Sequence, residues 1–305
     1  MTVTHLVTHS GGFHADEVLS SVILTRLHPQ ARIMRTRDAD WITPAEGRII
    51  YDVGRDFDAA RMIFDHHQKS PPLRDDGQPY SSFGLIWRQF GRDYLAALQV
   101  PAADIEAIHA AIDADLVLPI DLVDNGALSP TGPLADLSLP MLLESLKPVF
   151  DDRSPDADDR AFDGAVAIAR AFVEAAVARK AAKHRAEAVV MAAIAAAGDG
   201  RVLELPMGMP FRSAITAAGA DHLLFVIHPR DTDWALTGIR RDADGFALRA
   251  DLPAAWAGLT DGAFEAASGV PGARFCHNAR FIAVAADRDA ALRLADLAVA
   301  AASEV

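Results

Sequence analysis

The chain has 305 residues, which is enough for two domains with a shared or a separate core. Its 51% hydrophobic and 23% charged residues exclude a disordered protein. The net charge of −13 argues against loose binding of long nucleic acid, which depends on Lys and Arg. It leaves a phosphate substrate open, because bound divalent cations would dominate the local field.

Several features point to a cytoplasmic protein. The single cysteine, Cys276, rules out an intrachain disulfide and fits a reducing compartment. The first residues lack the basic start and apolar core of a signal peptide, and no apolar run approaches the length of a membrane helix. We therefore expect no membrane partner.

Strand and helix patterns alternate through residues 1–130. Apolar runs predict strands at 4–8, 32–36, 49–53 and 61–64, and helical spacing predicts helices at 16–27, 82–98 and 102–115. Ser81 or Ser82 is expected to cap the second of these helices. Such alternation indicates an α/β domain with a mainly parallel sheet.

The rest of the chain divides into a helical connector at 131–197 and a smaller α/β domain at 198–305. Ser154-Pro155 and the acids after it predict the start of a long helix that runs to about residue 197. Beyond it we expect strands at 202–205, 223–228, 234–239 and 275–285, and a closing helix at 288–302.

Metal-binding side chains gather in the first domain. They are His9, His14, Asp16, Asp52 and the triplet Asp65-His66-His67. His9, Asp52 and the triplet each follow a predicted strand, and ligands of parallel sheets collect at the carboxyl ends of strands. Imidazole and carboxylate together suit Mn²⁺, Fe²⁺, Co²⁺ or Zn²⁺ and indicate a catalytic rather than a structural site.

More candidate ligands exist than one ion can use. Two ions bridged by a carboxylate such as Asp52 would use them all and would hold a hydroxide for attack. A mononuclear site with spare carboxylates is the alternative. A carboxylate for the second ion could come from Asp121 or Asp124 in the segment 121–126, although Asp124-Asn-Gly alone is also a turn signal.

The order of these residues resembles the four motifs of the DHH phosphoesterase superfamily and, more narrowly, the Myg exonuclease family, formerly called metal-dependent protein hydrolases. The resembling stretches are 8–17, 35–38, 51–54, 64–68, 81–87, 121–126, 256–259, 269–272 and 275–277. The resemblance extends over essentially the whole chain. It implies a DHH-type catalytic domain at 1–130 and a substrate-gripping domain at 198–305.

The resemblance also implies a role for each site residue. His9, His14 and Asp52 would hold the first ion. The second ion would be held by Asp52, Asp16, His66 and Asp121. His67 would contact the substrate phosphate, with Asp65 orienting a neighbouring histidine. Mn²⁺ is the implied metal, with Mg²⁺, Co²⁺ and Zn²⁺ as alternatives.

Four further residues are candidates for binding substrate. Arg37 could bind phosphate or form a salt bridge with Asp38. Ser82 could contact an anion at a helix start or serve as a cap. In the C-terminal domain the family's glycine-rich loop is replaced by 276–284, where His277 or Arg280 could substitute, although His277 could equally pack within a strand.

Three functions remain in view. The first is a metal-dependent 3′-to-5′ exonuclease that acts on RNA or short oligonucleotides through attack by a metal-bridged hydroxide. The second is a phosphatase for pyrophosphate, a nucleotide or a dinucleotide, which the acidic surface favours. The third is a metal-stabilised binding protein without turnover. A homo-oligomer is compatible with all three.

Overall fold

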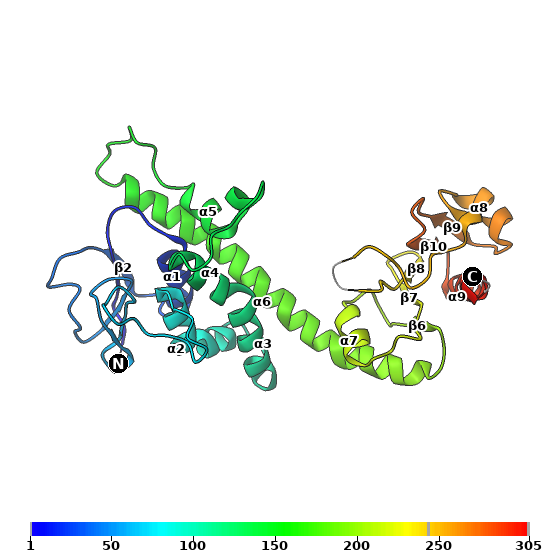
Figure 1. Ribbon diagram of the computed structural model, residues 1–305, viewed down its shortest axis with the longest axis horizontal. Coiled ribbons are helices and arrows are strands. Elements are labelled where there is room, and N and C mark those ends of the chain that lie inside the picture. Colours follow the sequence, from blue (N-terminus) through cyan, green and yellow to red (C-terminus); the bar gives the residue numbers. More distant parts are fainter. Residues whose placement is uncertain (1, 243–244, 304–305) are drawn as a thin grey trace. The chain divides into compact units, whose positions relative to one another are not determined.

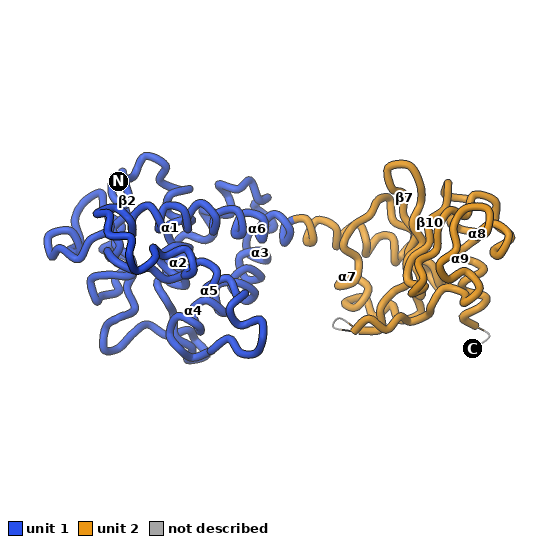
Figure 2. Tube along the Cα trace, turned by 90° about the horizontal axis from the view of Figure 1, so that it is seen from above, with its two compact units in different colours: residues 1–181 blue, residues 182–305 orange. Residues whose placement is uncertain are grey.

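The computed structural model describes residues 2–242 and 245–303. It confirms a mixed α/β fold with two five-stranded sheets. The chain divides into two compact units, residues 1–181 and 182–305, which are coloured separately in Figure 2. The domain limits expected from the sequence, 1–130, 131–197 and 198–305, remain predictions.

Unit 1 is built on a sheet with the strand order β2-β1-β3-β5-β4. The strand at one end of this order, β2, is labelled in Figure 1. The strands are β1 His5–Thr8, β2 Arg32–Arg35, β3 Arg48–Tyr51, β4 Phe57–Asp58 and β5 Ile63–Phe64. All neighbours pair in parallel except β4 with β5. The expected mainly parallel sheet is therefore present, and the carboxyl ends of β1, β3 and β5 meet at one edge.

Helices of unit 1 cover one face of this sheet. They are α1 Ala15–Leu27, α2 Ser82–Ala97, α3 Ile105–Ile112, α4 Leu118–Asp124 and α5 Leu139–Glu144, with a π-helical segment, Asp113–Val117, between α3 and α4. Apolar side chains of α1 and α2 pack with Leu6, Ile49 and Phe64 of the strands in one core. A smaller cluster that includes Val7 and Ile50 lies on the other face. Apolar packing on both faces holds the sheet in place. The polar residues therefore project from a rigid edge of the sheet.

Helix α6, Ala157–Ala197, has the predicted extent. Phe162 and Ala169 near its start belong to the core of unit 1, whereas Val190 near its end belongs to a core of unit 2. The helix therefore contributes to both units. No helix in the described part of the chain is long and apolar enough to cross a membrane.

Unit 2 has a mixed sheet with the strand order β6-β7-β8-β10-β9. Its elements are β6 Val202–Glu204, α7 Arg212–Ala217, β7 Phe225–Pro229, β8 Trp234–Gly238, α8 Asp261–Ser268, β9 Ala273–Cys276, β10 Ile282–Ala285 and α9 Arg288–Ser303. The single strand expected at 275–285 is wrong. This segment is a hairpin of β9 and β10, and the turn between them includes Arg280 at φ 57°.

Candidate metal centre

Three loops at the carboxyl edge of the first sheet carry the candidate ligands. His9 follows β1, Asp52 follows β3, and Asp65 to His67 follow β5. Asp52 has φ 55°, in the left-handed region that a residue with a short polar side chain tolerates better than most. Its backbone N–H donates to Phe64 O at 3.1 Å, which joins the ends of β3 and β5.

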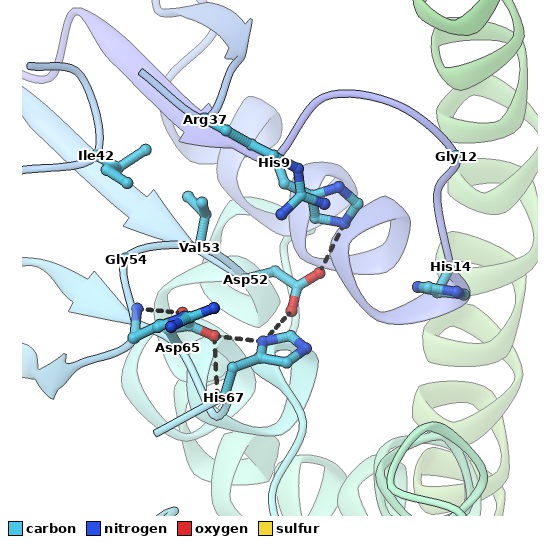
Figure 3. Close-up of a pocket in the computed structure, with 11 residues that line it drawn as sticks. His9, Gly12, His14, Arg37, Ile42, Asp52, Val53, Gly54, Asp65 and His67 are labelled. Atoms are coloured by element: carbon cyan, nitrogen blue, oxygen red, sulfur yellow. Dashed lines mark hydrogen bonds and ion pairs between the residues drawn. The ribbon is translucent and has the colours of Figure 1, made fainter. Parts of the chain in front are cut away.

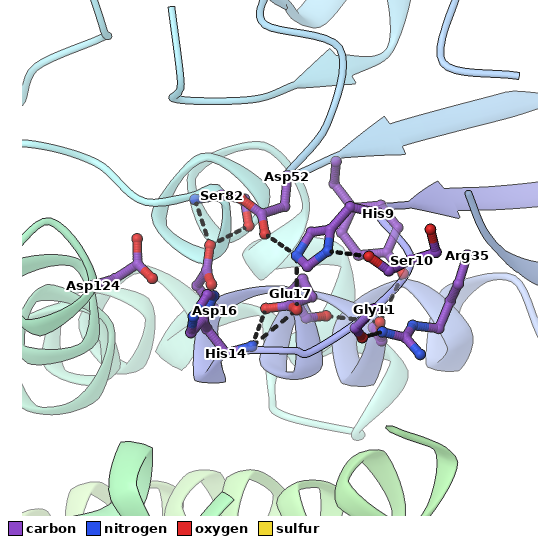
Figure 4. Close-up of polar contacts among 12 residues, drawn as sticks. His9, Ser10, Gly11, His14, Asp16, Glu17, Arg35, Asp52, Ser82 and Asp124 are labelled. Carbon is purple, nitrogen blue, oxygen red and sulfur yellow. Dashed lines mark hydrogen bonds and ion pairs between the residues drawn. The ribbon is translucent and has the colours of Figure 1, made fainter. Parts of the chain in front are cut away.

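His9 points its Nε2 atom at two carboxylates. This atom lies 3.0 Å from Glu17 Oε1 and 3.2 Å from Asp52 Oδ2 (Figure 4). The other ring nitrogen, Nδ1, lies 3.2 Å from the carbonyl oxygen of Ser10. A histidine whose Nδ1–H is held by a carbonyl oxygen presents a free Nε2 lone pair, which is the form that binds metal.

His66 has the same arrangement. Its Nε2 lies 3.3 Å from Asp52 Oδ1 and 3.4 Å from Asp124 Oδ2. Its Nδ1 lies 3.3 Å from Asn125 Oδ1, so a side-chain amide takes the place of the backbone carbonyl. His9 and His66 thus approach Asp52 through its two different oxygens, as a bridging carboxylate requires.

Helix α1 supplies two more carboxylates, Asp16 and Glu17, which are completely or almost completely buried. Glu17 accepts the backbone N–H of His14 at 2.9 Å on both oxygens, which closes the first turn of the helix. Asp16 Oδ2 accepts from Ser82 Oγ at 2.7 Å. Ser82 therefore orients a candidate ligand from the start of α2, and its contact with substrate stays a prediction.

The donor set fits a divalent metal. Asp16 Oδ1 is buried and accepts no hydrogen bond, and a buried carboxylate oxygen normally has a donor or a cation beside it. Ligand atoms within 4.8 Å of one another form four groups. They are Asp52, Asp65, His66 and His67; His9, His14 and Glu17; His14, Asp16 and Asp124; and Asp16, Glu17 and Asp52. Shared members link these groups into one cluster.

The crowding of these groups shifts their proton affinities. Burial and the neighbouring Asp16 charge raise the pKa of Asp124 to about 9, and burial raises the pKa of Glu17 to about 8. Despite burial, hydrogen bonds with Asp52 and Glu17 raise the pKa of His9 to about 10. Such shifts mark a place that attracts cations, whether protons or metal ions.

Asp65 and His67 form a hydrogen-bonded pair at the rim of the cluster. Asp65 Oδ1 lies 2.7 Å from His67 Nδ1, and the backbone N–H groups of His66 and Arg55 also donate to the Asp65 carboxylate. The His67 side chain is 56% exposed. Asp65 is placed to orient His67, whose other ring nitrogen remains available to a ligand.

Asp121 does not join the cluster, whereas Asp124 does. Asp121 Oδ1 accepts from Ser81 Oγ at 2.7 Å and from the backbone N–H of Gly84 at 3.1 Å, and Asp121 Oδ2 accepts from Arg74 at 2.7 Å. Asp121 thus caps the start of α2, in place of the direct serine cap that we expected. Both aspartates lie on α4, about one turn apart. Their positions along the helix place Asp124, and not Asp121, beside His66.

A cavity of about 590 Å³ opens beside the cluster (Figure 3). His9, His14, Asp52 and His67 line it together with Arg37 and Arg55. Figure 3 labels both Arg37 and His9 among the residues that line this cavity. The two guanidinium groups place positive charge where an anionic substrate would meet the metal ligands.

His277 and Arg280 lie in unit 2, at the turn between β9 and β10. His277 Nδ1 accepts the backbone N–H of Ala279 at 3.0 Å, and its ring centroid lies 4.5 Å from that of Phe281. Arg280 pairs with Asp251 at 2.7 Å and donates to Leu252 O at 3.3 Å. Both side chains have structural contacts within unit 2, and their substrate role stays a prediction.

Sequence reasoning did not identify Glu17 as a candidate ligand, and it did not predict the structural role of Arg35. Glu17 belongs to the resembling stretch 8–17, and its place one residue after Asp16 was the available signal. The Arg35 side chain is buried at the end of β2, donates to the carbonyl oxygen of Gly11 and lies 4.5 Å from the centre of the Phe162 ring. It holds the loop between His9 and His14 against α6, a contact that no local pattern reveals.

The fold and the site together define an α/β protein with a cluster of candidate metal ligands at the edge of a mainly parallel sheet. The family model MYG1_exonuc, described as an uncharacterised protein family (UPF0160), matches residues 5–299. The human MYG1 exonuclease is 30% identical over 334 residues, which cover 97% of this chain and 85% of that protein. A MYG1 protein of Saccharomyces cerevisiae is 28% identical, with coverage of 97% and 95%. The chain belongs to the MYG1 exonuclease family, and the resemblance seen in the sequence is confirmed.

Among solved structures, this chain is similar to RecJ of Thermus thermophilus in complex with Mn²⁺, with 14% identity and a TM-score of 0.29. The alignment covers 99% of this chain and 52% of that one. A second RecJ structure, an exonuclease bound to manganese, has 15% identity and a TM-score of 0.26, with coverage of 99% and 90%.

Proposed function

We propose that this protein is a divalent-metal-dependent phosphodiesterase that removes nucleotides from the 3′ end of RNA or short oligonucleotides. The observation that carries the proposal is the convergence of His9 and His66 on opposite oxygens of Asp52, beside the buried Asp16 Oδ1, which accepts no hydrogen bond. The name of the human relative, an exonuclease, supports the same reaction class.

We further propose that the cluster holds two ions, with Asp52 as the shared ligand. His9, His14 and Glu17 would contribute to one ion, and Asp16, His66 and Asp124 to the other. Nitrogen and oxygen donors without thiolate favour Mn²⁺, whereas Mg²⁺ prefers oxygen donors alone. Bound ions would supply a water molecule of lowered pKa and positive charge beside the phosphorus.

The protein's own groups would then position the substrate. Arg37 and Arg55 line the cavity of 590 Å³ and would hold phosphate oxygens. His67 stands at the rim of the cluster with its Nδ1–H held by Asp65, and this hydrogen bond raises the pKa of His67. In the protonated ring Nε2 also carries a hydrogen and can donate to a phosphate oxygen. Asp52, Asp16 and Glu17 have almost no access to water, which strengthens every charge interaction within the cluster.

The test compares two histidines at opposite ends of β1. His9→Ala should abolish release of mononucleotide from an end-labelled RNA in Mn²⁺ and should lower the amount of bound metal. His5→Ala is the matched control, because His5 contacts Thr4 and Trp41 at the far end of the same strand. A metal-loaded protein that hydrolyses no phosphodiester, or equal losses in both variants, would refute the proposal.

A small substrate is the second candidate, because the net charge of −13 opposes the approach of a long polyanion. The comparison is turnover of a dinucleotide and of an RNA of about 20 nucleotides under the same conditions. Faster turnover of the dinucleotide would favour the small-substrate function over the RNA exonuclease.

A further inference from the structure

A second cavity opens onto the metal cluster from the side of α4 and α5. It has a volume of about 380 Å³, within the range of roughly 300–1,000 Å³ that is typical of small-ligand sites. His14 and His67 line both this cavity and the larger one that contains Arg37. We call it the α4–α5 cavity. The two cavities therefore adjoin the candidate metal ligands from different sides.

The two cavities differ in charge and polarity. Arg37 and Arg55 line the larger cavity, whereas none of the residues that line the α4–α5 cavity, all within the described part of the chain, is Lys or Arg. Its apolar lining comes from Ile120 and Val123 of α4 and from Pro140 and Met141 of α5. The lining of the larger cavity suits a phosphodiester chain. The lining of the α4–α5 cavity suits an uncharged aromatic base.

Glu144 gives the α4–α5 cavity a hydrogen-bond acceptor. It lies at the end of α5, lines the cavity and pairs with Lys147 through Oε2 at 2.8 Å. A carboxylate only accepts hydrogen bonds, and the ribose at the 3′ end of RNA offers two neighbouring hydroxyl donors. Asn125 also lines the cavity, but its side chain already contacts His66, Tyr80 and Asp121.

We propose that the α4–α5 cavity binds the 3′-terminal ribonucleoside of the substrate, with the base against Met141 and Pro140 and the 2′,3′-diol at Glu144. This inference rests on the proposed function. The scissile phosphate then lies at His14 and His67, and the remaining chain extends past Arg37. Hydrolysis adds the oxygen of water to phosphorus and a proton to the departing 3′-oxygen of the shortened chain. The product in the cavity is a nucleoside 5′-monophosphate.

Glu144→Gln tests the contact with the diol. In the wild type, an RNA that ends in a ribonucleotide should have a lower KM than the same RNA ending in a 2′-deoxynucleotide. The variant should raise KM for the ribonucleotide end roughly tenfold and should erase the preference, since a hydrogen bond to a charged group is lost. Met141→Ala should raise KM for both ends, because it removes part of the apolar wall.

Leu142→Ser is the matched control, since Leu142 lies on α5 but is exposed and does not line the cavity. It should leave both KM values unchanged. Bis(p-nitrophenyl) phosphate, which has no nucleoside, separates the cavity from the metal centre. The losses in Glu144→Gln should be several-fold smaller with this substrate than with RNA. Equal losses on both substrates, or a preserved preference for the ribonucleotide end, would overturn the proposal.

A binding measurement keeps this inference separate from the proposed function. If the wild type hydrolyses neither substrate, the exonuclease proposal fails, and calorimetry with adenosine 5′-monophosphate and its 2′-deoxy analogue still tests the cavity. Tighter binding of the ribonucleotide, lost in Glu144→Gln and kept in Leu142→Ser, would support the nucleoside site. Equal binding of both nucleotides by all three proteins would refute it.

Discussion

Asp121 and Asp124 are two aspartates on one short helix with different tasks. Asp121 caps α2 and pairs with Arg74, and burial raises its pKa to about 6 against the hydrogen bonds from Ser81 and Arg74. Asp124 faces His66 and Asp16. The sequence predicted that one of them serves the second ion, but only the rotation of α4 distinguishes them.

This difference predicts opposite phenotypes. Asp121→Ala should lower the free energy of unfolding by about 3 kcal/mol, because Arg74 loses a buried partner, and should leave metal stoichiometry unchanged. Asp124→Ala should lose metal affinity and leave stability equal or higher, because it removes a repelling carboxylate. Urea unfolding and metal analysis of both variants provide the measurement. Loss of a bound ion in Asp121→Ala alone would reverse the assignment.

Metal binding should release protons. The pKa of His66 is raised to about 9, because pairing with Asp52 and Asp16 outweighs burial, and the pKa values of Glu17 and Asp124 are also raised. Each group is protonated more often below its raised pKa and must lose the proton to bind an ion. Affinity for Mn²⁺ should therefore rise with pH between about pH 6.5 and pH 9, roughly tenfold per unit for each proton released.

Calorimetry in buffers of different ionisation enthalpy counts these protons directly. The count should fall in His66→Gln, and His5→Ala should leave it unchanged. An affinity for Mn²⁺ that does not vary over this pH range would contradict the proposed ligands.

At the scale of elements, α2 and α3 approach each other closely at Gly91. A Cβ atom at this position would lie 2.8 Å from Cδ2 of Trp87 and 2.9 Å from the ring of His109, and the rings of Trp87 and His109 stack with centroids 5.0 Å apart. Both distances are too short for real contacts, so one ring has to move. Glycine is required here by packing, although it is a poor helix former.

Gly91→Ala should therefore lower the free energy of unfolding by about 1–3 kcal/mol, since overpacking outweighs the gain in helix propensity. Gly164→Ala in α6 is the matched control, because a Cβ atom there meets nothing within 4 Å. It should raise stability by up to about 1 kcal/mol. Urea midpoints measure both, and a stabilised Gly91→Ala would disprove the packing argument.

Helices were predictable where the spacing of apolar residues is regular. They were not predictable where tertiary contacts determine whether a helix forms. The spacing of α1 and the proline and acids before α6 predicted both helices nearly to their ends. The short helix α5 was not predicted, because its apolar residues lie in a proline-rich segment that resembles a linker. Its position beside the metal cluster depends on packing against α1, which no local pattern records.

The sequence predicted those residues of the candidate site that directly follow a recognisable strand. His9, Asp52 and the triplet that ends at His67 were placed at one sheet edge by apolar runs alone, and the structure brings them together. Their individual roles stay predictions. The hydrogen bond between Ser82 and Asp16 joins residues 66 positions apart, so it could not be predicted from local spacing.

At the scale of the whole molecule, the acidic composition sets how substrates of different length approach. The net charge of −13 repels a polyanion in proportion to its length, and salt screens this repulsion. The ratio of kcat/KM for an RNA of about 20 nucleotides to that for a dinucleotide should rise between about 50 mM and about 200 mM salt. A basic RNA-binding surface would give the opposite trend, so a falling ratio would point to a cationic track for RNA.

The left-handed backbone of Asp52 determines which inactive enzyme is useful for trapping substrate. Asparagine adopts this conformation as readily as aspartate does, whereas alanine and β-branched residues adopt it with strain. Asp52→Asn removes the charge and keeps the loop after β3 in place. It is the variant to crystallise with an uncleaved oligonucleotide.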